Sequence, residues 1–291
     1  GGPEPSPAPG HPEAEPGAPA SSLWDRLGGE DKIRALCNDI YDRHAADPLT
    51  APWFGAHVRG NIRKEAEVKQ YVFEFFSSGI GGPHAYTGRD MRSVHRHMEI
   101  GDHAFHAVAY HVLAAMASHE AGGDAEREEV LGILQSLRSE VLGGPEPSPA
   151  PGHPEAEPGA PASSLWDRLG GEDKIRALCN DIYDRHAADP LTAPWFGAHV
   201  RGNIRKEAEV KQYVFEFFSS GIGGPHAYTG RDMRSVHRHM EIGDHAFHAV
   251  AYHVLAAMAS HEAGGDAERE EVLGILQSLR SEVLGGPEPS P

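Results

Sequence analysis

Apolar residues recur three and four positions apart along most of the chain, which is the spacing of one helix face. The clearest run lies within Glu30–Ala46. Its stripe consists of Ile33, Leu36, Cys37, Ile40, Tyr41 and His44. Further helices are expected over Leu23–Leu27, around Lys64–Ile80 and over Arg89–Met98. No alternating strand pattern competes with this periodicity, so the sequence predicts an all-α fold.

Two more helices are expected to begin at acidic residues, Asp102 and Asp124, as N-caps. The first has an apolar stripe of Phe105, Val108, Ala109, Val112, Leu113 and Met116. The second points Val130, Leu131, Leu134, Leu137 and Val141 inward. The expected breaks between helices fall at Gly28-Gly29, at Pro48 and Pro52, and at Gly81-Gly82-Pro83.

The chain is a 142-residue unit written twice, because residues 1–142 and 143–284 match at every position and 285–291 begin a third copy. The predicted domains are 22–142 and 164–284, so every site exists twice at positions offset by 142. The proline-rich segments 1–21 and 143–163 are predicted to be polyproline II linkers. Since both ends fall in the same linker, we expect a piece of a longer array that assembles as a filament or homo-oligomer.

Charge and cysteine content narrow the possible partners. The net charge of −17 argues against nucleic acid and anionic membranes as partners. The sequence has no transmembrane run and no signal peptide. The single cysteines, Cys37 and Cys179, lie on the apolar face of a predicted helix, so buried free thiols are expected.

The chain contains 20 histidines, and one per copy stands out as a possible metal ligand. Haem iron needs one neutral imidazole held beside an apolar slot. His95 follows Met91 and Val94 on one predicted helical face. This pattern is weak alone, because a histidine among apolar residues is more often part of a core or a surface.

A family resemblance strengthens the assignment. Residues 22–142 resemble a truncated haemoglobin, the two-over-two globin fold, and are most similar to its first group. The resemblance rests on Leu23-Trp24-Asp25-Arg26-Leu27-Gly28-Gly29, Ile40-Tyr41-Asp42-Arg43, Pro52-Trp53-Phe54, Phe75-Phe76, Gly81-Gly82-Pro83, Tyr86–His95, Ile100 and Phe105.

The resemblance implies one haem b per domain, with His95 and His237 as proximal iron ligands. It implies that Phe54 and Phe196 wedge the porphyrin. Further haem contacts are expected from Val68, Val72, Phe75, Met91 and Val94, and from their equivalents Val210, Val214, Phe217, Met233 and Val236.

Tyr41 and Tyr183 match the distal tyrosine of the family, whose hydroxyl donates a hydrogen bond to bound dioxygen. The alternative is a core tyrosine bonded to a backbone carbonyl. The family often carries glutamine where this chain has valine on the distal helix. Tyr71 and Tyr213 are the remaining candidate donors there, so weaker retention of oxygen than is common in the family is expected.

The other histidines and the basic residues have less specific expectations. His103, His106 and His111 are predicted to lie on the surface, with a zinc pair at His103 and His106 as the weaker alternative. His97 is expected to face solvent, and His57 is a minor candidate for a sixth iron ligand. The candidate partners of the haem propionates are Arg59, Arg63, Lys64 and Arg92.

Reversible binding of dioxygen or another diatomic gas is the leading functional hypothesis. An enzymatic alternative is nitric oxide dioxygenation, as the resemblance implies; it requires a reductant, and no G-x-G-x-x-G fingerprint is present. A third alternative is a structural or electron-relay haem filament. An extracellular location would suit the filament, and a cytoplasmic one is the alternative.

Overall fold

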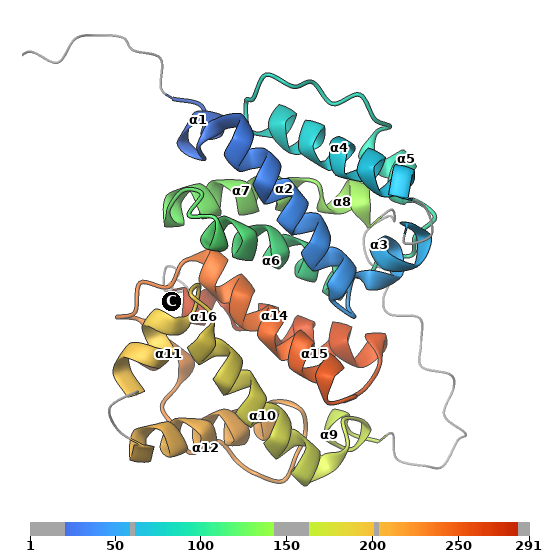
Figure 1. Ribbon diagram of the computed structural model, residues 1–291. Helices are drawn as coiled ribbons and strands as arrows, with labels where there is room; N and C mark the ends of the chain where they lie inside the picture. The colour runs from blue at the N-terminus through green and yellow to red at the C-terminus, as the bar shows by residue number, and fades with distance from the viewer. Residues whose placement is uncertain (1–20, 59–61, 143–162, 201–203, 285–291) are drawn as a thin grey trace, which may run out of the picture.

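The computed structural model describes residues 21–58, 62–142, 163–200 and 204–284. Within these residues every regular element is a helix, and the second copy repeats the first (Figure 1). The first copy comprises α1 (Leu23–Arg26), α2 (Gly29–Ala46), α3 (Ala51–Val58), α4 (Ile62–Gly79), α5 (Met91–His95), α6 (Asp102–Ser118), α7 (Asp124–Ser136) and α8 (Arg138–Val141). The second comprises α9 (Leu165–Arg168), α10 (Gly171–Ala188), α11 (Ala193–Val200), α12 (Ile204–Gly221), α13 (Met233–His237), α14 (Asp244–Ser260), α15 (Asp266–Ser278) and α16 (Arg280–Val283). The all-α prediction is confirmed.

Helix α3 is absent from the sequence-based expectation, which treats Pro48 and Pro52 as breaks. Pro52 is the second residue of α3. A proline in the first helical turn costs little, because the N–H groups there have no partner within the helix. Pro52 therefore begins a helix, and this helix carries Phe54.

The predicted N-caps Asp102 and Asp124 are wrong by one position. Gly101 and Gly123 are the N-caps, and each aspartate is the first helical residue. A carboxylate in the first turn still interacts favourably with the helix dipole. Asp102 also accepts a hydrogen bond from Nε of Arg138 at 2.6 Å, which fastens α8 to the start of α6.

The core of the first copy forms around α2, and that of the second copy forms in the same way around α10. All six residues of the predicted stripe on α2 are buried, including Cys37, whose thiol is free as expected. Burial raises the pKa of Cys37 to about 12, so the thiol stays protonated. The first four residues of the stripe, Ile33 to Ile40, pack with Trp24, Phe73 and Met116 into one cluster, which brings together α1, α2, α4 and α6.

The second glycine pair allows α4 to end against α1. Gly81 has a φ of +79°, a conformation that favours glycine. A Cβ atom on Gly82 would lie 2.4 Å from Cε3 of Trp24. The backbone N–H of Trp24 donates to the carbonyl of Ile80 at 2.9 Å, so the chain closes tightly over the indole.

The two copies pack through α6 and α14, which face each other at the centre of the molecule (Figure 1). Most of the 17 residues of α6 are buried, on more than the one face that the sequence predicts. The surface expectation for His103, His106 and His111 is therefore wrong: each is no more than 5% exposed. The second copy covers the side of α6 that a single domain would leave in solvent.

The contact is reciprocal. Each of His106 and His248 directs its Nε2 at the backbone carbonyl of the other, at 2.9 Å in both directions, and the two rings stack with centroids 3.3 Å apart. His103 Nδ1 lies 2.7 Å from Glu270 of the second copy, and His245 Nδ1 lies 2.7 Å from Glu128 of the first. The same surface is used on both sides, as in a twofold contact.

The predicted linkers lie outside the described residues except for their last residues, Ser21 and Ser163, so their expected polyproline II conformation stays a prediction. None of the described helices is both long enough and apolar enough to cross a membrane.

Candidate functional site

The short helix α5 presents His95 in a form suited to binding a metal. Asp90 caps the helix by accepting a hydrogen bond from the N–H of Ser93 at 2.9 Å. The half-buried His95 donates from Nδ1 to the carbonyl of Met91 at 2.8 Å. A carbonyl only accepts, so the proton of the neutral imidazole is on Nδ1 and the lone pair is on Nε2. His237 repeats this at 2.7 Å from Met233.

Tyr41 of α2 and Phe54 of α3 lie next to each other. Tyr41 is buried on α2, and its ring meets that of Phe54 edge-on, with centroids 5.8 Å apart and planes at 79°. Tyr183 and Phe196 repeat this arrangement at 5.8 Å and 78°. Burial raises the pKa of Tyr183 above its ordinary value. The phenol therefore remains protonated at neutral pH and can donate a hydrogen bond.

The residues of α4 that the sequence predicts to contact haem or its ligand differ in their burial. Val68 and Phe75 are half-buried, and Val72 packs against the core cluster. The Tyr71 side chain is 37% exposed, and its hydroxyl donates to the carboxylate of Glu67 at 3.3 Å. The structure thus separates the two candidate tyrosines: Tyr41 is buried beside Phe54, and Tyr71 lies at the surface.

Trp53 is a residue to which the sequence assigned no role, although it stands beside Phe54. Its indole Nε1 donates to the carbonyl of Met98 at 2.7 Å. This bond joins α3 to the segment that follows α5. The side of the site that carries Phe54 is thereby fixed relative to the side that carries His95.

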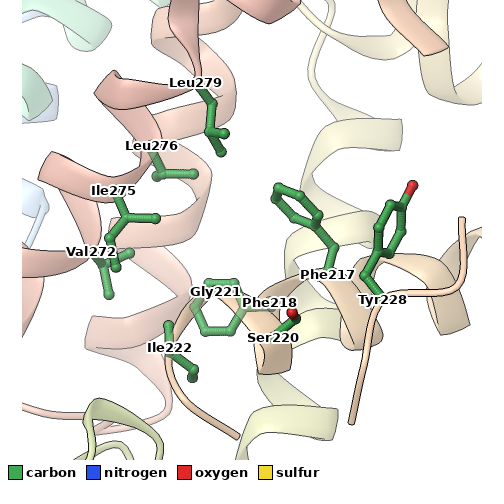
Figure 2. Close-up of a pocket in the computed structure, with 10 residues that line it drawn as sticks. All are labelled: Phe217, Phe218, Ser220, Gly221, Ile222, Tyr228, Val272, Ile275, Leu276 and Leu279. Carbon is green, nitrogen blue, oxygen red and sulfur yellow. The ribbon is translucent and has the colours of Figure 1, made fainter. Parts of the chain in front are cut away.

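An apolar cavity of about 270 Å³ opens between α12 and α15 in the second copy (Figure 2). It is lined by Phe217, Phe218, Ser220, Gly221, Ile222, Tyr228, Val272, Ile275, Leu276 and Leu279. Phe217 is one of the predicted haem contacts. The described lining residues include neither His237 nor Tyr183, so this cavity covers only one edge of the predicted site.

The remaining candidates fall outside the site or outside the described side chains. His97 is exposed as expected, and its Nε2 accepts from Nε of Arg96. Arg92 is exposed. The part of the chain that the structure describes holds no group of three or more His, Cys, Asp or Glu residues suited to a metal ion. The side chains of His57, Arg59, Arg63 and Lys64 lie outside the described residues.

These residues fit a flat, largely apolar cofactor that contains a metal. One imidazole per copy is fixed by a hydrogen bond on Nδ1, as metal-binding histidines usually are, and its Nε2 is free of hydrogen bonds to the described residues. Aromatic and aliphatic side chains supply the apolar walls, and a buried phenol supplies one hydrogen-bond donor. Haem meets these requirements.

Comparison with known proteins agrees with this chemistry. The family model described as bacterial-like globin matches residues 22–154 and 164–285. Group 1 truncated hemoglobin GlbN of Mycolicibacterium paratuberculosis is 34% identical over 133 residues, which cover 45% of this chain and 89% of that protein. GlbN of Nostoc sp. is 30% identical over 122 residues, covering 42% and 98%.

Solved structures similar to this chain include one of a truncated hemoglobin. The truncated hemoglobin of Tetrahymena pyriformis in its Fe(III) form has 22% sequence identity and a TM-score of 0.39, covering 43% of this chain and all of that one. Since the family model matches in both copies, this protein belongs to the bacterial-like globin family, as two truncated-globin domains in tandem with one haem as the cofactor of each.

Proposed function

We propose that each domain binds a diatomic gas reversibly, chiefly dioxygen, with Tyr41 and Tyr183 as the distal donors. The observation that supports this most is the buried tyrosine beside Phe54, in a domain whose His95 keeps Nε2 free. Haem, when bound, would supply the iron that coordinates the gas. The protein supplies the imidazole, the apolar walls that exclude water, and one hydroxyl.

The hydroxyl is effective because it acts in a water-poor pocket. A donor fixed in surroundings of low dielectric interacts strongly with a ligand that carries partial negative charge, as bound dioxygen does. Tyr41 is only 3% exposed. Nitric oxide dioxygenation would use the same donor and also needs a source of electrons, so gas binding is the simpler function for these residues.

The filament expected from the sequence gains no support from the domain contact. Both copies use the same surface of α6 or α14, so the contact is complete once two domains have paired. A head-to-tail filament would need a second surface. The domain contact therefore supports a closed pair of gas-binding domains.

Dissociation of dioxygen tests the distal assignment. Tyr41→Phe with Tyr183→Phe removes one charge-assisted hydrogen bond per site, worth ~1.5–3 kcal/mol, and should speed dissociation roughly 10- to 150-fold. Stopped-flow spectroscopy measures this rate. The matched substitution of Tyr71 and Tyr213 by Phe should change it less than about twofold, because those hydroxyls bond to surface glutamates. An unchanged rate in the Tyr41 variant, or an equal effect of the Tyr71 variant, would contradict the assignment.

A further inference from the structure

The turn between α2 and α3, and the equivalent turn between α10 and α11, each pack against the other domain. Leu49, in the first of these turns, is 4% exposed. It packs in a cluster that contains Ala251, Leu255 and Leu273 of the second copy. The equivalent Leu191 packs in a cluster with Ala109, Leu113 and Leu131 of the first copy. The segment that leads into α3, and so to Phe54, therefore depends on a neighbour for its apolar packing.

A polar contact reinforces the same turn from across the interface. The hydroxyl of Tyr252 donates to Oδ2 of Asp47 at 2.8 Å, and the hydroxyl of Tyr110 donates to Oδ2 of Asp189 at 2.7 Å. The two tyrosine rings stack with centroids 3.7 Å apart and planes at 11°. Each tyrosine thus reaches out of its own domain and fixes the turn of the other.

Two histidines, His111 and His44, connect Asp47 to the interior of the domain. Burial alone would raise the pKa of Asp47, but hydrogen bonds from His111 and from the N–H of Leu49 hold it below its ordinary value, so it is a carboxylate. His111 Nε2, 2.9 Å from Asp47, must therefore donate. His111 Nδ1 lies 2.8 Å from Nδ1 of His44. Burial and the neighbouring His111 lower the pKa of His44, so His44 is neutral.

His111 Nε2 donates to the Asp47 carboxylate, and the two Nδ1 atoms of His111 and His44 share one proton between them. Tyr252, Asp47, His111 and His44 then form a continuous hydrogen-bonded row. The second copy repeats it with Tyr110, Asp189, His253 and His186.

The row ends against the aromatic wall of the site. The His44 ring lies 4.6 Å from the Phe54 ring, and Phe54 meets Tyr41 edge-on. The backbone carbonyl of His44 also accepts from Oγ1 of Thr50 at 2.6 Å, which locks the turn to the end of α2. A shift of the turn would therefore move the aromatic pair that faces the gas.

We propose that Tyr252 is a positioning residue for the gas site of the first domain, and Tyr110 for that of the second. This inference rests on the proposed function, because the row ends at Phe54 and Tyr41. Since each domain holds the other's turn, the affinities of the two sites are coupled, and such a coupling is reciprocal.

Tyr252→Phe and Tyr110→Phe form a matched pair in the full chain. Both remove one hydroxyl from the same interface and keep the stacked rings. In a His237→Ala background only the first domain holds haem, so gas dissociation reports on that site alone. Tyr252→Phe, in the haem-free domain, should change the dissociation rate about two- to tenfold. Tyr110→Phe, in the haem-bearing domain itself, should leave it within about 1.5-fold, since its hydroxyl serves Asp189. Equal effects of the two, or none from Tyr252→Phe, would overturn the proposal.

A second readout needs no gas. In haem-free protein carrying Trp195→Phe and labelled with 5-fluorotryptophan, Trp53 reports on α3, and Trp24 and Trp166 serve as references. Tyr252→Phe should shift the fluorine resonance of Trp53 and leave the references unchanged, and Tyr110→Phe should shift none. An unmoved Trp53 resonance would also overturn the proposal. Failure of the proposed function is distinguishable, because it would appear as wild-type protein that binds no gas.

Discussion

Helices α5 and α6 both carry histidines, but the two helices use them in opposite ways. On α5, a helix of five residues none of which is fully buried, His95 engages Nδ1 and keeps a lone pair on Nε2. On α6, His111 engages both nitrogens, with His44 and Asp47, and His103 engages Glu270 of the other copy. Burial alone therefore does not identify a ligand.

The difference shows what makes a histidine available to a metal. A ligand needs one nitrogen fixed and the other free beside open space, which a short, half-exposed helix provides. The α6 histidines are buried at the contact with the second copy. His103 and His106 bond across it, whereas His111 bonds to His44 and Asp47 of its own copy. The same residue type is thus the proposed cofactor ligand on one helix and part of the domain contact on the next.

The largest expected effect comes from a charge placed in the contact. Ala107→Asp with the equivalent Ala249→Asp would bury carboxylates among leucines of both copies. An unpaired buried charge of this kind should cost about 3–5 kcal/mol at each position. Urea unfolding and an increased radius of gyration in small-angle scattering measure the loss.

The control for this variant is Ala66→Asp with Ala208→Asp, at exposed positions of α4 and α12. These substitutions should change stability by less than about 0.5 kcal/mol. Haem content should stay at two per chain in both variants, because His95 lies on α5, which packs against α8 of its own copy. Loss of haem with separation of the domains would contradict the division of roles between α5 and α6.

Stability is also expected to depend on pH. Burial lowers the pKa of His248 to about 4, and it lowers the pKa of His44, His106 and His186 as well. Below pH 6.5 these histidines are protonated in the unfolded chain but stay neutral in the native protein. The free energy of unfolding therefore falls as pH falls from 6.5 towards 4. The loss is about 1.4 kcal/mol per histidine per pH unit.

Substitution identifies which helix causes this acid sensitivity. His106→Gln with His248→Gln should reduce the pH slope of the unfolding free energy by about two protons. His97→Gln with His239→Gln should leave it unchanged, because both side chains are exposed. Chemical unfolding at pH 7, 6 and 5 measures the slopes. Identical slopes in wild type and in the His106 variant would contradict the account.

The sequence predicts the features that depend on contacts within a single domain. The stripe on α2 identifies the core, because helical periodicity and burial within one copy determine it. The sequence also predicts a helix around His95. Within this helix the carbonyl of Met91, four residues before His95, accepts from Nδ1 and so leaves the lone pair on Nε2. The exposure of Tyr71 depends on the exact rotation of α4, which sequence spacing leaves open.

What the sequence misses arises between the copies. The polar residues His103, His106 and His111 look like a solvent face, because the surface that buries them belongs to the other domain. Asp47 and Tyr110 likewise give no signal, since each finds its partner in the other copy. The sequence of two identical domains does not indicate which of their surfaces pack against each other.

The most direct test of the central claim is the number of haems per chain in two matched variants, measured by the pyridine haemochrome method. Wild type should hold two. His97→Ala with His239→Ala should also hold two, because those exposed rings lie beside the site without serving it. His95→Ala with His237→Ala should lose both, since these proposed iron ligands are the sole histidines of α5 and α13. Retention of two fully coordinated haems in the His95 variant would contradict the account.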